Sequence, residues 1–357
     1  MITPFTLDVP QADLDDLRDR LARTRWPDEL PDAGLDYGFP LARVRELADH
    51  WLHAYDWRRH EAELNALPQF TTAIDGQRVH FLHVRSANPD ALPLVLVHGW
   101  PGSVVEFLDV VEPLSRDFHL VVPSIPGFGL SGPTTSRGWD VHRVARAFAE
   151  LMRRLGYDRY GTQGGDWGSG IARAVAAAVP EHVVAVHVNY LPTPPVDGVA
   201  LSEEDERRLV KIRAMIRSRP GYQVVHATRP QTVAYALTDS PVGQLAWNAE
   251  KFAEWVDPDC EIDVDRVLTN VMLYWLTGTA GSSARLARET GIVGNDCPAP
   301  LGVAVFAHDI VLSVRPLAEL RYRVEHWSEF DRGGHFAALE TPDLFVGDLR
   351  KFFAGRS

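Results

Sequence analysis

The sequence predicts an α/β fold in which a mostly parallel, doubly wound sheet is preceded by a helical extension and interrupted by a helical insertion. Apolar runs of strand length alternate with helical patterns across 71–192, and the alternation resumes across 296–357. Such alternation is typical of a parallel sheet with helices on both faces. Most of the stretch 193–295 is helical in pattern and rich in charge. We therefore expect a core in two parts, a helical cap at 193–295, and an extension at 1–70 that wraps the core.

The N-terminal extension has the pattern of two amphipathic helices and a linker. Apolar residues recur at three- and four-residue spacing in two stretches. They are Leu14, Leu17 and Leu21, and then Val44, Leu47 and Trp51. The intervening segment, 26–40, contains the prolines and glycines that interrupt helices. No catalytic group stands out here, so the extension is expected to have a structural role.

The core elements follow from apolar runs and from the turns between them. Continuous apolar runs favour strands that are buried on both faces of a parallel sheet. Strands are expected at Phe70–Ile74, Val79–Val84, Leu92–Val97, Phe118–Val122, Tyr160–Gly164, Val183–Asn189, Gly302–Ala307 and Arg321–His326. Helices are expected at Val104–Leu114, Val141–Leu155, Ile171–Val179 and Leu344–Phe353.

Composition excludes several classes of partner. A net charge of −12 would repel nucleic acid and anionic membrane surfaces. No apolar run approaches the ~20 residues that a membrane-spanning helix needs, so a cytoplasmic location is expected. The two cysteines, Cys260 and Cys297, suggest reduced thiols, and neither a metal nor a cofactor is expected.

The stretch Gly164–Ser169 has the form of a nucleophile elbow, a strained turn between a strand and a helix. Its exposed residue is Asp166 instead of the usual Ser or Cys. Attack of a carboxylate on a saturated carbon that bears a leaving group gives an ester, which water can then cleave. The elbow therefore points to hydrolysis through an Asp ester.

Two later residues complete a catalytic triad in this interpretation. Asp309 follows a late strand, and His335 lies in a Gly-Gly-His loop before the last helix. The order nucleophile, acid, His is that of the α/β-hydrolase fold. His308 and Asp331 are rival candidates, because both are polar and near these positions in sequence.

At this point the chain resembles the microsomal type of epoxide hydrolase across nearly its whole length. The resemblance rests on motifs in the extension, the core and the cap. They are Arg25-Trp26-Pro27, Tyr55-Asp56-Trp57-Arg58, Leu64-Asn65, Pro68-Gln69-Phe70, His98–Ser103, Gly164–Ser169, Asp239–Gly243, Leu268–Trp275 and Arg332–Ala338. The membrane anchor of that family has no counterpart here, so the chain is expected to be similar to its soluble bacterial members.

The resemblance implies a two-step mechanism. Asp166 would attack an oxirane carbon, and His335, held by Asp309, would activate the water that hydrolyses the ester. The backbone N–H groups of Trp100 and Trp167 would form the oxyanion hole.

The resemblance also implies two cap tyrosines that donate hydrogen bonds to the epoxide oxygen. The first corresponds to Tyr222, whereas Ala287 stands at the second position. Either Tyr222 acts alone or with water, or another cap donor such as Tyr274 or Trp275 takes the role. Residues expected to line the substrate pocket are Pro101, Tyr274, Trp275, Trp247 and Phe336.

Two other functions remain open at this stage. A haloalkane dehalogenase uses the same Asp ester chemistry, and a ligand-binding protein without activity could retain this scaffold. The expected partners are a small apolar epoxide and, for a homodimer, a second copy of the chain.

Overall fold

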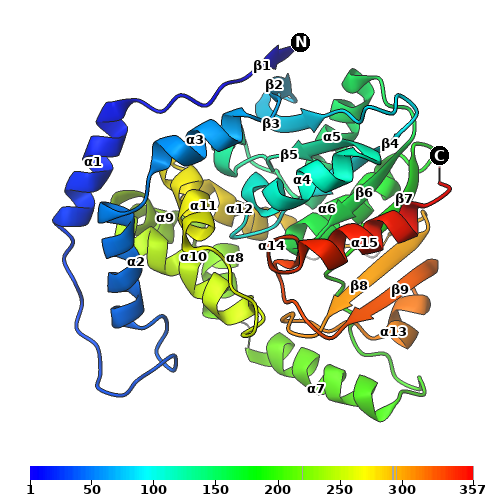
Figure 1. Ribbon diagram of the computed structural model, residues 1–357. Helices are drawn as coiled ribbons and strands as arrows, with labels where there is room; N and C mark the ends of the chain where they lie inside the picture. The colour runs from blue at the N-terminus through cyan, green and yellow to red at the C-terminus, as the bar shows by residue number, and fades with distance from the viewer. Residues whose placement is uncertain (219, 292, 295, 357) are drawn as a thin grey trace.

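Over the residues that the computed structural model describes, 1–218, 220–291, 293–294 and 296–356, nine strands form one mixed sheet (Figure 1). The strand order is β1-β2-β3-β5-β4-β6-β7-β8-β9. The six strands from β5 to β9 in this order are parallel, and β1, β2 and β3 are antiparallel at one edge. The predicted α/β-hydrolase fold is confirmed. Residues 295 and 357, which end the predicted cap and core, lie outside the described residues.

The strands coincide closely with the predicted apolar runs. They are β1 (Ile2–Pro4), β2 (Gln69–Ile74), β3 (Gln77–Val84), β4 (Leu92–Val97), β5 (Phe118–Pro123), β6 (Tyr160–Gly164), β7 (Val183–Val188), β8 (Leu301–Phe306) and β9 (Val324–Phe330). Only the last prediction is displaced, because β9 is an edge strand that carries Glu325, Ser328 and Glu329 and lacks a continuous apolar run. Strand β1, which pairs with β2 at the edge of the sheet, was not predicted.

Helices cover both faces of the sheet. Those of the core are η1 (Val104–Phe107), α4 (Leu108–Ser115), η2 (Gly129–Ser131), α5 (Val141–Leu155), α6 (Asp166–Ala178), α13 (Arg315–Glu319), α14 (Ala337–Glu340) and α15 (Pro342–Phe353). Figure 1 shows α4 and α15 on one face and α5 and α6 on the other. Helix α6 begins five residues before the predicted Ile171, because the elbow joins the helix without a loop.

In the described part of the chain between β7 and β8 there are six helices. They are α7 (Glu203–Ser218), α8 (Gly221–Thr228), α9 (Pro230–Asp239), α10 (Pro241–Trp255), α11 (Val264–Thr277) and α12 (Ala280–Thr290). Figure 1 shows α7 apart from the other five, near α13 and β9. There Leu209 and Ile212 pack against Leu317, and Arg208 forms an ion pair with Glu329 at 2.7 Å. Helix α7 is therefore anchored on the core, whereas α8–α12 form the group that we call the cap helices.

The N-terminal extension clamps two of the cap helices. It contains α1 (Gln11–Ala22), α2 (Leu41–His53) and α3 (Trp57–Asn65), of which α3 was not predicted. Helices α1 and α2 contact α10. The Tyr55 hydroxyl lies 2.9 Å from the Thr269 hydroxyl of α11, and His50 Nε2 lies 2.7 Å from an Asp265 carboxylate oxygen. The extension thus braces the outer side of the cap helices.

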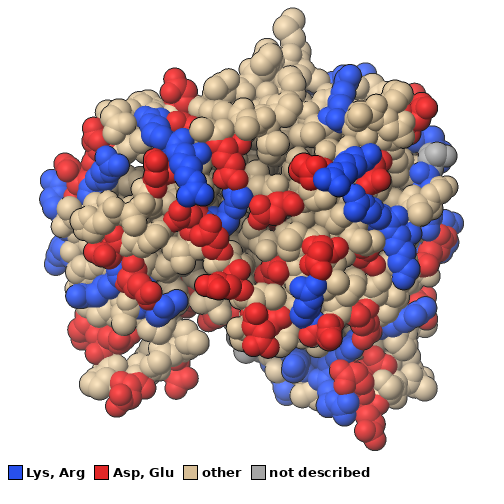
Figure 2. Space-filling view, viewed as in Figure 1, with Lys and Arg blue, Asp and Glu red and all other residues tan. Residues whose placement is uncertain are grey.

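Lys and Arg side chains share the visible surface of the molecule with Asp and Glu side chains (Figure 2). Acidic and basic side chains are interspersed over the face seen in Figure 2. Among the described residues, no helix is both long enough and apolar enough to cross a membrane.

Candidate active site

Asp166 has the strained backbone conformation that is typical of a nucleophile elbow. Its φ is +47°, a left-handed value that non-glycine residues seldom adopt and that costs on the order of 1–3 kcal/mol. The turn brings backbone segments into close contact: a Cβ on Gly164 would lie 2.2 Å from the Gly168 backbone, and one on Gly168 would lie 2.0 Å from the Val97 carbonyl oxygen. The two glycines therefore hold Asp166 over the end of the sheet.

Replacing Gly168 with alanine is expected to lower the free energy of unfolding by at least about 3 kcal/mol, because the Val97 carbonyl cannot retreat from a buried strand. Urea unfolding would measure the change. Gly347→Ala is a matched control, since a Cβ in this exposed position of α15 meets no atom within 4 Å. That variant should gain up to about 1 kcal/mol from better helix propensity. Parent-like stability of Gly168→Ala would contradict this picture of the elbow.

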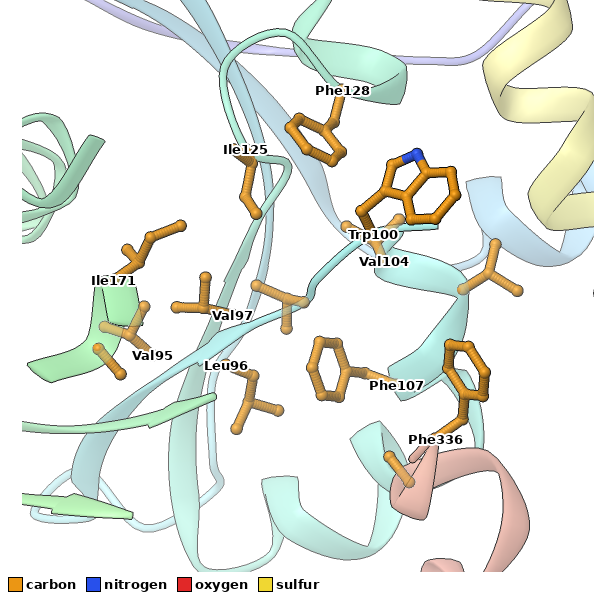
Figure 3. Close-up of a cluster of buried hydrophobic side chains, with 14 of the residues drawn as sticks. Val95, Leu96, Val97, Trp100, Val104, Phe107, Ile125, Phe128, Ile171 and Phe336 are labelled. Atoms are coloured by element: carbon orange, nitrogen blue, oxygen red, sulfur yellow. The ribbon is translucent and has the colours of Figure 1, made fainter. Parts of the chain in front are cut away.

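Strand β4 leads directly into the loop that faces Asp166. Figure 3 shows Val95, Leu96 and Val97 buried before the chain reaches Trp100. The backbone N–H of Trp100 donates a hydrogen bond of 2.8 Å to Asp166 Oδ1. Trp167, as the second residue of α6, has no acceptor within its own helix for its N–H. One N–H donor therefore meets the carboxylate, and a second one, without an acceptor in its own helix, belongs to the next residue along the chain.

His335 lies between two carboxylates. Its Nδ1 is 2.8 Å from Asp309 Oδ1, and its Nε2 is 3.4 Å from Asp166 Oδ2. Asp309 also accepts a hydrogen bond of 2.7 Å from the N–H of Ile310. The two rival candidates for the acid position have other surroundings. His308 Nε2 is 3.6 Å from Asp257, and Asp331 is exposed. The structure therefore brings Asp166, His335 and Asp309 together.

The charge state of His335 follows from this position. Burial lowers the pKa of the imidazole, but the Asp309 and Asp166 carboxylates outweigh burial and raise the pKa to about 10. The imidazole is therefore protonated at neutral pH. Forming an ester on Asp166 would remove one of these two negative charges, so the pKa of His335 would then fall and release a base.

The loop that carries His335 is bonded to the end of α10. The His335 N–H donates to the Trp255 carbonyl at 2.9 Å, and the Gly333 N–H donates to Asp257 Oδ2 at 2.7 Å. The Glu340 carboxylate accepts hydrogen bonds from the N–H groups of Asp257 and Phe336, both at 2.8 Å. The position of the imidazole thus depends on cap residues as well as on the core.

A cavity of about 190 Å³ opens beside Asp166. Its lining includes Trp100, Trp167 and Tyr190 from the core and Tyr222 and Ala287 from the cap helices. Burial, and then the Asp166 charge, raises the pKa of Tyr222, so this phenol keeps its proton. The Gln223 side-chain amide donates to the Tyr222 oxygen at 3.0 Å, which leaves the phenol hydrogen available to another acceptor.

The five residues expected to line the pocket are absent from the lining of this cavity, which corrects that expectation. The Tyr274 hydroxyl donates to the Gly102 carbonyl at 2.7 Å and is fully buried there. Trp275 lies on the outer side of α11, where the Arg20 guanidinium is 5.9 Å from its ring. The Pro101 carbonyl accepts from Asn270 at 2.6 Å, and Phe336 stacks on Phe252. None of these four residues is among those that line the cavity beside Asp166.

The fifth residue, Trp247, is not among the residues that line the cavity, but it contacts His226, which does line it and which was not predicted. Its indole N–H donates to His226 Nε2 at 3.0 Å, and His226 itself lines the cavity. His226 lies four residues after Tyr222 on α8, and this spacing places both side chains on one helix face. The same spacing could have identified His226 from the sequence. Tyr190 was also missed, although its ring packs edge-on against His335 at 5.5 Å.

Comparisons with known proteins agree with this geometry. Residues 2–107 match the model for the epoxide hydrolase N terminus, and residues 93–199 match the model for the alpha/beta hydrolase fold. A putative epoxide hydrolase of Stigmatella aurantiaca is 44% identical over 99% of this chain and 84% of that protein. Epoxide hydrolase 1 of Sus scrofa is 33% identical over 98% and 88%. The structure of Aspergillus niger epoxide hydrolase superposes with a TM-score of 0.93 at 32% identity, covering 100% of this chain and 97% of that one.

Proposed function

This chain belongs to the epoxide hydrolase family, and from that premise we propose that Asp166, His335, Asp309 and Tyr222 open a small apolar epoxide to a vicinal diol. The family acts through an Asp ester that His-activated water hydrolyses. The contact of His335 with both Asp166 and Asp309 is the observation that carries the assignment of roles.

In the first step, a carboxylate oxygen of Asp166 attacks a ring carbon, and the carbon–oxygen bond of the epoxide breaks. The released alkoxide takes a proton from the Tyr222 phenol, whose hydrogen is free because Gln223 already donates to its oxygen. In the second step, neutral His335 removes a proton from water, which attacks the ester carbonyl. The bond between the carbonyl carbon and the diol oxygen then breaks, and the diol leaves as it takes the proton from His335. The Trp100 N–H, which bonds Asp166 Oδ1, stabilises the oxyanion that forms there, and Trp167 supplies the second donor.

The alternatives fit the site less well. A halide leaving group needs N–H donors and no proton, so a buried phenol with a free hydrogen is better suited to an alkoxide. A protein without activity has no need of an imidazole held between two carboxylates. A cytoplasmic location, a homodimer and the division at residues 70, 192 and 295 stay predictions.

Replacing Tyr222 with phenylalanine is expected to slow ester formation by about 10²- to 10⁴-fold, the range typical of general acid catalysis. The rate would be measured with styrene oxide as the burst of protein–substrate adduct, by rapid quench and intact mass. Tyr235→Phe is the matched control, because this tyrosine of α9 is 71% exposed and should not affect the burst. A parent-like burst in Tyr222→Phe would show that the proton donor is another group.

A further inference from the structure

Two polar side chains of α8, Tyr222 and His226, line the cavity together with Ala287 of α12. On α8, Tyr222 and His226 are one turn apart, and their rings lie 5.9 Å from each other, edge to face. Both rings pack on Trp100, at 5.0 Å and 4.7 Å between centroids. These three aromatic residues line the same cavity as Asp166, and the Trp100 N–H is bonded to the Asp166 carboxylate.

The contact with Trp247 decides which nitrogen of His226 carries the proton. An indole N–H is a donor only, so His226 Nε2, 3.0 Å away, must be the acceptor and has no hydrogen. Burial lowers the pKa of His226 to about 4, so the ring is neutral near pH 7 and its one proton is on Nδ1. Among the described residues, Nδ1 has no hydrogen-bond partner.

The other polar groups of the cavity are less suited to the epoxide oxygen. Ser169 donates its hydroxyl hydrogen to the Tyr190 carbonyl, and Gln223 donates to Tyr222. The guanidinium of Arg173 is bonded to the Tyr322 hydroxyl at 2.8 Å. Tyr190 packs against His335, on the side of the site that serves ester hydrolysis. His226 is the donor that shares a helix face with Tyr222.

Resting on the proposed function, we propose that the Nδ1–H of His226 is the second hydrogen-bond donor to the epoxide oxygen and replaces the phenol that Ala287 lacks. When Asp166 attacks, the electron pair of the broken bond moves to that oxygen, which accepts hydrogen bonds from Tyr222 and His226 together. Tyr222 then transfers its proton and regains one from solvent, while His226 keeps its own. A neutral imidazole can polarise an oxygen in this way without becoming ionised. Trp247 acts as a positioning residue, because its N–H holds His226 in the required tautomer.

The kinetic test compares two variants of His226 in the same styrene oxide burst. His226→Phe keeps a ring but has no donor, so ester formation should slow by about 10²-fold, as for loss of one oxyanion donor. His226→Gln retains an N–H donor and should recover most of the rate. The decay of the ester, once formed, should be unchanged in both. A parent-like burst in His226→Phe, together with a slow one in Tyr190→Phe, would overturn the assignment to His226.

Nitrogen NMR of selectively labelled histidine tests the tautomer without any turnover. The expected spectrum of the parent shows His226 protonated at Nδ1, and Trp247→Phe should give a mixture of tautomers. A small aryl amide, whose carbonyl is a stable substitute for the epoxide oxygen, should shift the Nδ1–H signal. A proton on Nε2 in the parent would overturn the proposal. A parent that forms no ester from any epoxide would instead contradict the proposed function, and the NMR result would then decide the role of His226 alone.

Discussion

Replacing Asp166 with asparagine is expected to lower diol formation by at least about 10⁴-fold, because an amide is a poor nucleophile and no other carboxylate can replace it in the elbow. The side chain keeps its shape and can still accept from the Trp100 N–H, so the fold should be retained. Turnover of styrene oxide with chiral analysis of the diol measures the loss. Asp331→Asn is the matched control, since this exposed residue lies outside the site and should leave turnover intact.

The origin of the diol oxygen gives a sharper test of the same step. In a single turnover in heavy-oxygen water, the oxygen added to the diol should come from the Asp166 carboxylate and carry no label. The label should then appear in the peptide that contains Asp166. If solvent oxygen entered the first diol directly, Asp166 would be a base and the ester mechanism would be wrong for this chain.

Replacing His335 with glutamine should trap the ester. Ester formation needs Asp166 and the cap donors, whereas hydrolysis needs a base, so the second step should slow by about 10²- to 10⁴-fold while the first continues. Intact mass should show a stable adduct of protein plus substrate. His308→Gln changes the neighbouring imidazole, which faces Asp257, and should turn over without accumulating adduct.

The pH dependence of ester hydrolysis tests whether His335 acts as a base, because a purely structural role of His335 would not change that dependence. In the free protein, Asp309 and Asp166 raise the pKa of His335 to about 10 although burial opposes them. Once the ester forms, only Asp309 remains charged, and the pKa must be lower. Ester decay in the parent should therefore rise with pH and level off well below pH 10. Loss of adduct formation in a folded His335→Gln variant would contradict this division of the two steps.

The sheet and the elbow could be predicted from the sequence because each depends on local pattern. A run such as Leu92–Val97 leaves few alternatives to a strand that is buried on both faces. Gly164 and Gly168 mark close backbone contacts that any side chain would block. Asp309 and His335 followed from their order along the chain, since the fold brings the ends of parallel strands to one edge of the sheet.

The cap side of the site could not be predicted in the same way. Tyr274 and Trp275 are aromatic and adjacent, yet one turns its hydroxyl to the Gly102 carbonyl and the other faces α1. Which face of a buried helix meets the ligand depends on how the helix packs, and α11 is apolar over most of its surface. His226 was missed for a different reason. Its four-residue spacing from Tyr222 places it on the same helix face, but this signal does not reveal its role, which depends on the Trp247 contact from α10.

The hydrogen bonds from the His335 loop to Trp255 and Asp257 determine whether the cap segment could be exchanged as a separate unit. The stretch 193–295 is a contiguous insertion in sequence, but the amide of His335 has its acceptor inside that insertion. Excising the stretch would leave Gly333 and His335 with unpaired N–H groups at the catalytic edge, so it could not be exchanged between relatives as an independent block. Because the His335 N–H is bonded to Trp255 at the end of α10, a hinge motion at that end would displace His335.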